Sequence, residues 1–191
     1  ALDNRGRELL EVGGTANFGT QSLGVNISRY NDNVKDDPTL PVNVFWEANV
    51  LYGLTRWPTL PVMVAYKFGR QESDDVPGSV GKTLDKASHD VSGQVSYLAG
   101  FVSTSLSGGY STTDDRTQLG ADSTSWNVRL APGFNWPSLS LTPSAAYSET
   151  RIQQIRTEIT TLGLDGRGQF FQSRLTAELG GSWTSTVASD R

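Results

Sequence analysis

The sequence contains no cysteine, which excludes disulfide bridges and thiolate metal sites. It contains one histidine, His89, and a lone histidine without an identifiable nucleophile does not make a catalytic site. It has no basic excess, because 16 Lys and Arg stand against 20 Asp and Glu, so nothing favours nucleic acid as a partner. We therefore expect no catalytic residues, no cofactor, no metal site and no nucleic-acid partner.

Long hydrophobic runs are missing as well. Hydrophobic residues make up 36% of the chain, and no stretch approaches the ~18 apolar residues that a membrane-spanning helix needs. The mean hydropathy of −0.36 resembles that of a soluble protein, but such an index does not detect strands in which apolar and polar residues alternate. The 20 glycines and the many Ser and Thr residues favour β structure with tight turns.

What the sequence does contain is a two-residue hydrophobic period. Every second residue from Trp126 to Trp136 is apolar, and the alternation resumes after a Pro-Ser corner from Leu139 to Tyr147. The same period runs along most of the chain and predicts about ten strands and no helix. The predicted fold class is therefore all-β.

One stretch departs from the period. In residues 153–166, Ile155 and Ile159 are out of phase with Leu162 and Leu164. A β-bulge inserts one extra residue into a strand and would bring the two sets onto one face. The sequence therefore predicts a bulge in this stretch.

The connections between the predicted strands alternate in character. Three of them are long and polar and carry an Asp-Asp pair, whereas the others are short corners, two of which contain Trp-Pro. A further short corner is expected at 167–170. Residues 1–191 are predicted to form a single domain, or a segment of one, with hairpins near 8–30, 43–69, 87–112, 123–150 and 153–185.

Strands of about ten residues, short turns on one rim and long loops on the other resemble the outer-membrane β-barrels of Gram-negative bacteria, of the porin or exporter kind. From Trp126 to Trp136, ten steps of about 3.3 Å tilted by roughly 40° span about 25 Å, the apolar band of such barrels. The resemblance implies that residues 1–191 form a transmembrane, antiparallel, up-and-down β-barrel domain or a segment of one, with about ten strands visible as part of a larger barrel. It also implies a location in the bacterial outer membrane, in contact with its lipid and lipopolysaccharide. The aromatic residues expected at the two membrane interfaces are Trp46, Trp57, Trp126, Trp136, Phe171 and Trp183.

The second face of the strands is expected to line the barrel interior. Most of its residues are Ser, Thr, Gly, Ala and Asn, which would fill the lumen of a small closed barrel poorly. This composition predicts a wide hydrated lumen or one occupied by another chain; alternatively, Ser and Thr are simply strand formers tolerated on a polar face. The expected pore-lining residues are Glu47, Asn49, Lys67, Gln94, Arg129, Arg174 and Glu178.

Two functions are compatible with these features. The first is a pore for solute passage or polymer export, and the second is a structural barrel or sleeve that anchors a larger outer-membrane assembly around a plugged lumen. A soluble β-sandwich or β-repeat binding module would also alternate, but the number of large apolar residues at the strand ends disfavours it.

The ends of the chain predict an incomplete barrel. The first strand is expected to leave residues 1–7 at the long-loop rim, and the last strand places residues 189–191 at the same rim. Complete barrels of the family that the chain resembles bring both ends to the short-turn rim. We therefore expect further strands of a longer polypeptide, or strands from other chains, to complete the barrel.

Overall fold

The computed structural model describes residues 8–32, 42–74, 82–117, 120–171 and 175–190. These residues form β-strands joined by turns, and no helix among them is long and apolar enough to cross a membrane. The strands are β1 (Glu8–Phe18), β2 (Gln21–Asn31), β3 (Val42–Leu54), β4 (Val62–Asp74), β5 (Lys82–Ala99), β6 (Val102–Asp115), β7 (Ser123–Trp136), β8 (Leu139–Ile152), β9 (Ile155–Phe170) and β10 (Leu175–Asp190).

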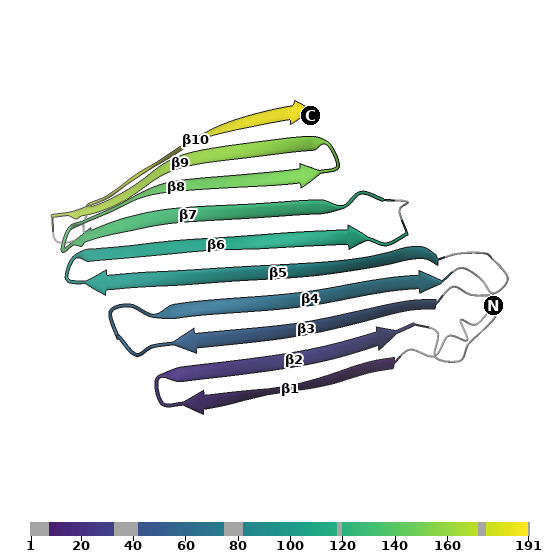
Figure 1. The fold of residues 1–191 in the computed structure, drawn as a ribbon. Helices are drawn as coiled ribbons and strands as arrows, with labels where there is room; N and C mark the ends of the chain where they lie inside the picture. The colour runs from purple at the N-terminus through teal and green to yellow at the C-terminus, as the bar shows by residue number, and fades with distance from the viewer. Residues whose placement is uncertain (1–7, 33–41, 75–81, 118–119, 172–174, 191) are drawn as a thin grey trace, which may run out of the picture.

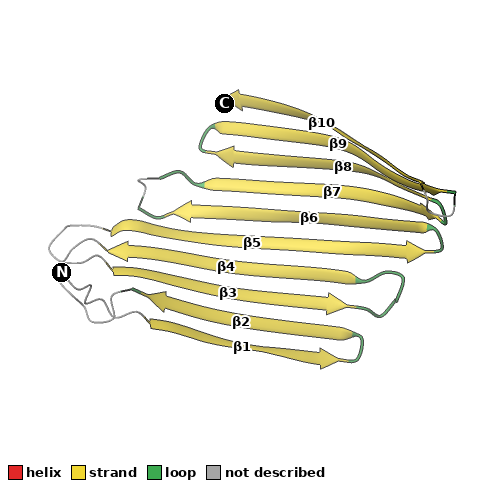
Figure 2. Ribbon diagram, turned by 180° about the vertical axis from the view of Figure 1, so that it is seen from behind, coloured by secondary structure: helices red, strands yellow, loops and turns green. Residues whose placement is uncertain are grey.

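All ten strands lie in one sheet, in chain order, and each pairs antiparallel with the next (Figure 1). β1 and β10 lie at opposite edges, and in the described part of the chain they do not pair with each other. The all-β, up-and-down fold class predicted from the sequence is confirmed, and the sheet is open. We call the end with the β1–β2, β3–β4, β5–β6, β7–β8 and β9–β10 connections the turn rim, and the opposite end the loop rim (Figure 2).

The register of the strands gathers the alternating apolar residues on one face. Because directly opposed residues of antiparallel strands share a face, the pairings from β2 to β7 can be followed as one row. That row consists of Val25, Val50, Tyr66, Val91, Tyr110 and Trp126. A slip of one residue in any pairing would turn a strand's apolar residues to the other side. We call this side of the sheet the apolar face and the opposite side the polar face.

The sheet has no hydrophobic core beneath it. Ala87 is the one buried apolar residue within the described ranges, whereas Leu106 and Leu130 in the middle of the sheet are 47% and 44% exposed. A soluble sandwich would cover such a face with a second sheet, and the described strands form one layer. This arrangement counts against the sandwich that the sequence left open.

The bulge predicted in residues 153–166 is absent. β9 pairs residue by residue with β8 and with β10 along its length, without a shift in register. The two-residue connection Gln153–Gln154 joins Ile152 directly to Ile155, and Gln153 adopts a φ of 54° there. Because so tight a hairpin fixes the register, Ile155 and Ile159 simply point to the polar face.

The corner predicted at 167–170 is wrong too, because these residues are the last part of β9 and pair with β10. Gly168 lies within the strand and not in a turn. Two ring carbons of Phe170 lie 2.7 Å from the position that a Cβ on Gly168 would take, so glycine leaves room for the aromatic ring. The chain leaves the strand at Phe171, which has a φ of 52° and is 77% exposed.

β4 and β5 continue further toward the loop rim than the sequence pattern suggested. Residues 70–74 and 82–86 are strand although their sequence is rich in charge. On the apolar-face side of this extension, Arg70 forms ion pairs with Glu72 and, at 3.5 Å, with Asp85. Charge pairing between neighbouring strands therefore replaces the apolar contacts that end near Tyr66 and Phe68.

Candidate functional site

The polar face, which we call the polar wall, carries six of the seven residues predicted to line a pore. Their side follows from the register, since each alternates with members of the apolar rows. Arg174 lies outside the described residues. The six are Glu47 and Asn49 on β3, Lys67 on β4, Gln94 on β5, Arg129 on β7 and Glu178 on β10.

Three of these residues form one cluster. Asn49 lies directly across from Lys67, and Glu47 lies two residues earlier on the same face of β3. The Nζ of Lys67 is 2.9 Å from Oε2 of Glu47, and the side-chain amide of Asn49 donates a 2.7 Å hydrogen bond to Oε1 of Glu47. The two charged side chains are 50% and 41% exposed, so their pairing mainly orients the groups and contributes at most about 1 kcal/mol to stability.

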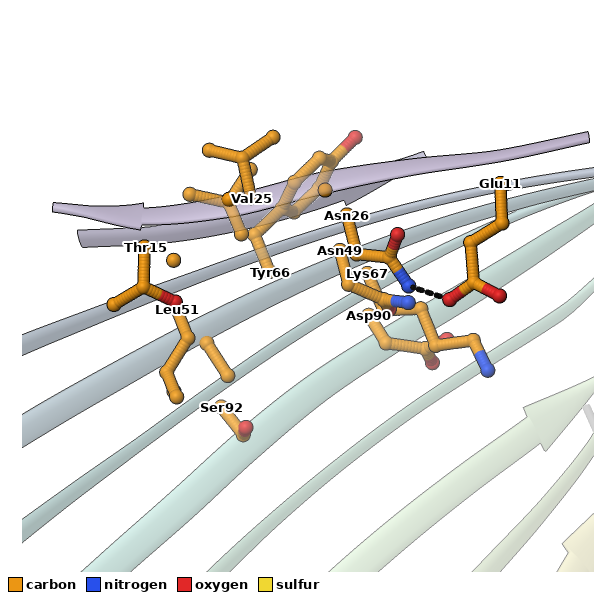
Figure 3. Close-up of a pocket in the computed structure, with 15 residues that line it drawn as sticks. Glu11, Thr15, Val25, Asn26, Asn49, Leu51, Tyr66, Lys67, Asp90 and Ser92 are labelled. Carbon is orange, nitrogen blue, oxygen red and sulfur yellow. Dashed lines mark hydrogen bonds between the residues drawn. The ribbon is translucent and has the colours of Figure 1, made fainter. Parts of the chain in front are cut away.

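Glu11, Asn26 and Asp90 extend this cluster, although the sequence analysis did not select them. Asn26 donates a 2.9 Å hydrogen bond to Glu11, and Asp90 lies directly across from Lys67 (Figure 3). Together with Thr15, Ser92 and neighbouring strand residues they border a hollow of about 950 Å³ on the polar wall. The alternation already carried the signal, because Asn26 stands between two apolar strand residues, Val25 and Ile27.

The other predicted residues lie apart from this cluster. Gln94 donates to the hydroxyl of Ser96 at 3.3 Å. Arg129 and Asp165 both border a second hollow, of about 600 Å³. Glu178 pairs with Arg167 at 3.5 Å, nearer the turn rim. The polar wall thus carries charges of both signs at separate places.

Over much of the polar wall the side chains project little from the sheet, because serines lie across from glycines. At four cross-strand pairs, a Cβ built on the glycine would come within 2.5 to 2.8 Å of the serine Oγ. The serine therefore lies over its partner and projects less from the sheet. The pairs are Ser22 with Gly53, Ser88 with Gly69, Ser103 with Gly133, and Ser144 with Gly163.

A few apolar residues interrupt the polar wall. Near the loop rim, Leu9, Tyr30 and Phe45 are neighbours on β1, β2 and β3, and the rings of Tyr30 and Phe45 are 5.8 Å apart. Leu51 and Met63 lie nearer the turn rim on the same wall and are 46% and 51% exposed. The two-residue pattern did not reveal these residues, because each falls at a position that the pattern assigns as polar.

Five of the six aromatic residues predicted at the membrane interfaces lie toward the two rims. Trp46 and Trp126 lie toward the loop rim, and Trp57, Trp136 and Phe171 lie at the turn rim. Trp183 was expected near the loop end of its strand, but it lies near the middle of β10, across from Leu162. Several make ring contacts: Trp126 lies 4.9 Å from Tyr147, Trp136 lies 5.8 Å from Phe101, and the guanidinium of Arg29 lies 5.3 Å from the ring of Trp46. Their role at membrane interfaces stays a prediction.

A charged network caps the apolar face at the loop rim of β8 and β9. Arg151 and Arg156 bind the two carboxylate oxygens of Glu149 at 2.6 and 2.7 Å, and the Glu149 side chain is 5% exposed. Arg156 also pairs with Glu158 at 2.7 Å. The β8–β9 connection is only two residues long. These ion pairs, and not a loop, therefore cover the end of the apolar face here.

The base of the β6–β7 connection is fixed by Asp115. The hydroxyl and the backbone N–H of Thr117 donate to its Oδ1 at 2.6 and 3.0 Å, and Lys86 lies 4.0 Å from Oδ2. These hydrogen bonds, led by that of the hydroxyl, hold the pKa of the Asp115 carboxyl below its usual range.

His89 lies on the apolar face, away from the polar wall. Its Nδ1 is 2.8 Å from the hydroxyl of Tyr66, and its ring centroid is 5.1 Å from that of Phe68. These contacts place the histidine beside aromatic residues of the apolar face, on the side opposite to Lys67 and Asp90.

No protein-family model matches the sequence, and no curated protein matches it either. Solved structures do match. The siderophore receptor PiuA of Acinetobacter baumannii overlays with a TM-score of 0.62 at 9% identity, over 95% of this chain and 44% of that one. The outer membrane transporter YddB of Escherichia coli also gives a TM-score of 0.62 at 9% identity, over 94% of this chain and 34% of that one.

At this level of identity the likeness concerns the fold. The chain spans less than half the length of either protein, and in both overlays nearly all of its sheet follows an arc of a larger barrel. The chain has the fold of part of a Gram-negative outer-membrane β-barrel.

Proposed function

We propose that this chain forms part of the wall of an outer-membrane pore, with its apolar face toward lipid and its polar wall toward a hydrated passage for solutes or an exported polymer. In this proposal the aromatic residues of the two rims lie at the membrane interfaces. No catalytic role is proposed. The proposed lining residues remain Glu47, Asn49, Lys67, Gln94, Arg129, Arg174 and Glu178, and Glu11, Asn26 and Asp90 join them.

The contrast between the two faces carries the proposal. An apolar face with no second layer needs a nonpolar solvent, and in lipid a sheet pairs all its backbone groups when it closes as a barrel. The opposite face carries partly exposed ion pairs such as Glu47–Lys67, which need water. Serines that lie over glycines leave the space in front of the wall open.

The charges on the wall suit hydrophilic solutes rather than ions of one sign. The wall carries three basic residues and five acidic ones, at separate places. The basic residues are Lys67, Arg129 and Arg167. The acids are Glu11, Glu47, Asp90, Asp165 and Glu178. An excess of one sign would focus a strong field in a low-dielectric lumen, and this mixture produces a weaker one.

Conductance across planar bilayers tests the pore directly. Full-length protein extracted from outer membranes is expected to give stepwise currents that grow with salt concentration. Ser107→Trp, on the wall between Gln94 and Arg129, is expected to lower the step size, whereas Leu106→Trp on the adjacent apolar-face position is expected to leave it unchanged. Silent bilayers, or equal effects of the two variants, would contradict the proposal.

A second candidate is a structural sleeve around an inserted partner. The apolar group Leu9, Tyr30 and Phe45 on the polar wall favours it, because these side chains would otherwise face water at the loop rim. A sleeve would remain silent in the bilayer. It would also protect a cysteine at Ser107 from water-soluble maleimide until the partner is removed, which an open pore would not do.

A further inference from the structure

The ladder between β7 and β8 is interrupted in the interior of the sheet. The two strands pair on both sides of the interruption in the same register, but residues 131–133 of β7 and 142–144 of β8 form no pairs with each other. The other neighbouring strands pair continuously within the described residues, apart from an irregularity between Ser73 and Asp74 near the loop rim. We call the six residues of the interruption the β7–β8 seam.

Two prolines cause the interruption. The register places Pro132 directly opposite Pro143, and no other proline lies within the described strands. Opposed residues of an antiparallel ladder alternate between hydrogen-bonded and non-hydrogen-bonded pairs. The N–H of Gln153 donates to the carbonyl of Asp122 at the end of this ladder, and steps of two residues from that bond lead to a hydrogen-bonded pair at the prolines. Because proline has no N–H, both hydrogen bonds of this pair are missing, and two carbonyl oxygens lack their donors.

Both strands keep their outer neighbours at the seam. Residues 131–133 pair with 103–105 of β6, and residues 142–144 pair with 163–165 of β9. Toward the turn rim, three further pairs and the two-residue connection hold β7 and β8 together. The two strands can therefore part at the seam without leaving the sheet.

The two sides of the seam differ in character. On the apolar face, Pro132 lies between the apolar residues Leu130 and Phe134. Ser144 lies over Gly163 of β9, on the side of β8 away from the seam. The seam residues on the polar wall all have small side chains, and they are Ala131, Gly133, Thr142 and Ser144. Little side-chain bulk therefore covers the interruption from the polar wall.

The second hollow of the polar wall adjoins the seam. Ser144 belongs to the seam and borders this hollow of about 600 Å³ together with Arg129, which lies two residues from Ala131 on the same face of β7. Arg129 is exposed and has no ion-pair or hydrogen-bond partner among the described residues. Its guanidinium is available to an anionic group such as a phosphate. A molecule with its anionic head in the hollow would reach the apolar face through the seam.

We propose that the β7–β8 seam opens as a lateral passage between the lumen and the bilayer. The passage admits the acyl chain of an amphiphile whose anionic head lies in the hollow at Arg129. Lipid offers no donors to the carbonyls of Pro132 and Pro143, which makes the closed seam less stable than the other seams of the sheet. Opening toward the hollow brings water to these carbonyls. The inference rests on the proposed function, because the hollow has to face a hydrated lumen.

Photolabelling from the bilayer tests the passage. The full-length protein is reconstituted in vesicles of phosphatidylethanolamine and phosphatidylglycerol, in which a small fraction of the lipid carries a diazirine on one acyl chain. Light converts the diazirine to a carbene that inserts into neighbouring residues, and mass spectrometry maps the labels. Labels are expected on the apolar face, as at Leu106, and on the polar wall only beside the seam, at Arg129 and Ser144. Ser96 and Ser105, opposed on the polar wall of β5 and β6, are expected to remain unlabelled.

Restoring the missing donors is expected to close the passage. Pro132→Val and Pro143→Val together supply two N–H groups to the ladder and keep the side chains apolar. The labels at Arg129 and Ser144 should then fall to the level of Ser105, while the label at Leu106 stays unchanged.

A disulfide across the seam tests the same point without changing the prolines. Ala131→Cys with Ser144→Cys places two cysteines at an opposed, non-hydrogen-bonded pair, where Cα atoms about 4.5 Å apart suit a disulfide. Ser96→Cys with Ser105→Cys is the matched control, because these residues form the same kind of pair in the uninterrupted β5–β6 ladder. The chain has no cysteine of its own. The seam disulfide is expected to remove the label at Arg129, and the control disulfide is expected to leave it.

Two results would overturn the passage and leave the pore. One is labelling confined to the apolar face, and the other is a label at Arg129 that persists in a folded variant with restored donors or with the seam disulfide. Labels at Ser96 and Ser105 as strong as the label at Leu106 would overturn the pore itself, because the polar wall would then face lipid.

Discussion

The two faces of this sheet use the same strands but follow different packing rules. On the apolar face large side chains stand opposite each other, as Leu106 does with Leu130. Three residues away on the same two strands, on the polar wall, Ser103 lies over Gly133. In the proposed pore, the first rule places large side chains toward lipid, and the second reduces the size of the side chains on the wall that faces water. The difference indicates that each face is adapted to its own solvent rather than to a packed core.

The strongest test of this contrast places one charge on each face at neighbouring positions. Leu106→Arg is expected to lower the free energy of unfolding by about 2–4 kcal/mol, because the charge would enter lipid near the middle of the membrane. Folding into vesicles, followed by urea titration, measures the loss.

Ser105→Arg is the matched control. It lies next to Leu106 on β6 but points to the polar wall, where an arginine can reach water. A change within ~0.5 kcal/mol is expected for such an exposed site. Equal losses for the two variants would show that the faces are assigned incorrectly.

A smaller loss in the free energy of unfolding is expected at the serine–glycine pairs of the polar wall. In Gly133→Ala the new methyl would lie 2.5 Å from Oγ of Ser103, which must move and would lose its 3.1 Å hydrogen bond from Asn135. A loss of about 1 kcal/mol follows. Gly14→Ala on the apolar face of β1, where nothing lies within 4 Å, is expected to be neutral or slightly stabilising. The same urea titration compares them, and a more harmful Gly14→Ala would reverse the contrast.

Removing the cation of the main cluster is expected to affect selectivity more than stability. Lys67→Met leaves Glu11, Glu47 and Asp90 on the wall without their nearby ammonium group. The unfolding free energy should fall by less than ~1 kcal/mol, because the Glu47–Lys67 pair is half exposed. The reversal potential in a salt gradient should shift toward cation preference, and an unchanged potential would argue against these residues lining the pore.

The smallest effect concerns the loop rim. Because the pKa of Asp115 is lowered in the folded protein, its ionised form stabilises the β6–β7 connection at pH values above the ordinary range of Asp. That contribution is lost as the pH falls through the lowered pKa. Limited proteolysis near Arg116 is therefore expected to speed up in acid, and Asp115→Asn should show the faster cleavage at neutral pH already. A variant with unchanged cleavage at both pH values would contradict this role.

The sequence predicts the two faces because alternation is a local property. A two-residue period from Trp126 to Trp136 is enough to assign sides without knowing which strands are neighbours. The same locality misleads at Ile155 and Ile159, where the hairpin at Gln153 fixes a register that turns both residues to the polar face. Gly168 misleads for a similar reason, because glycine signals a turn until the position of Phe170 is known.

The candidate site was less predictable, because it depends on pairs between strands. Glu47, Asn49 and Lys67 could be selected as polar residues, but their contact follows from the β3–β4 register. The serine–glycine pairs join residues as far apart in sequence as Ser22 and Gly53, and nothing in either strand alone indicates them. Charge, size and period can be read along the chain, whereas cross-strand partners cannot.

The central claim is that one face meets lipid and the other meets water, and cysteine labelling tests it most directly. Single cysteines are introduced at each position from Val102 to Ser111 in the otherwise cysteine-free chain and treated with a water-soluble maleimide in intact outer membranes. Labelling is predicted to alternate, with Ser103, Ser105 and Ser107 reacting, and with Leu106 and its neighbours on the same face protected. Uniform labelling along β6, or strong labelling at Leu106 with protection at Ser105, would contradict the account.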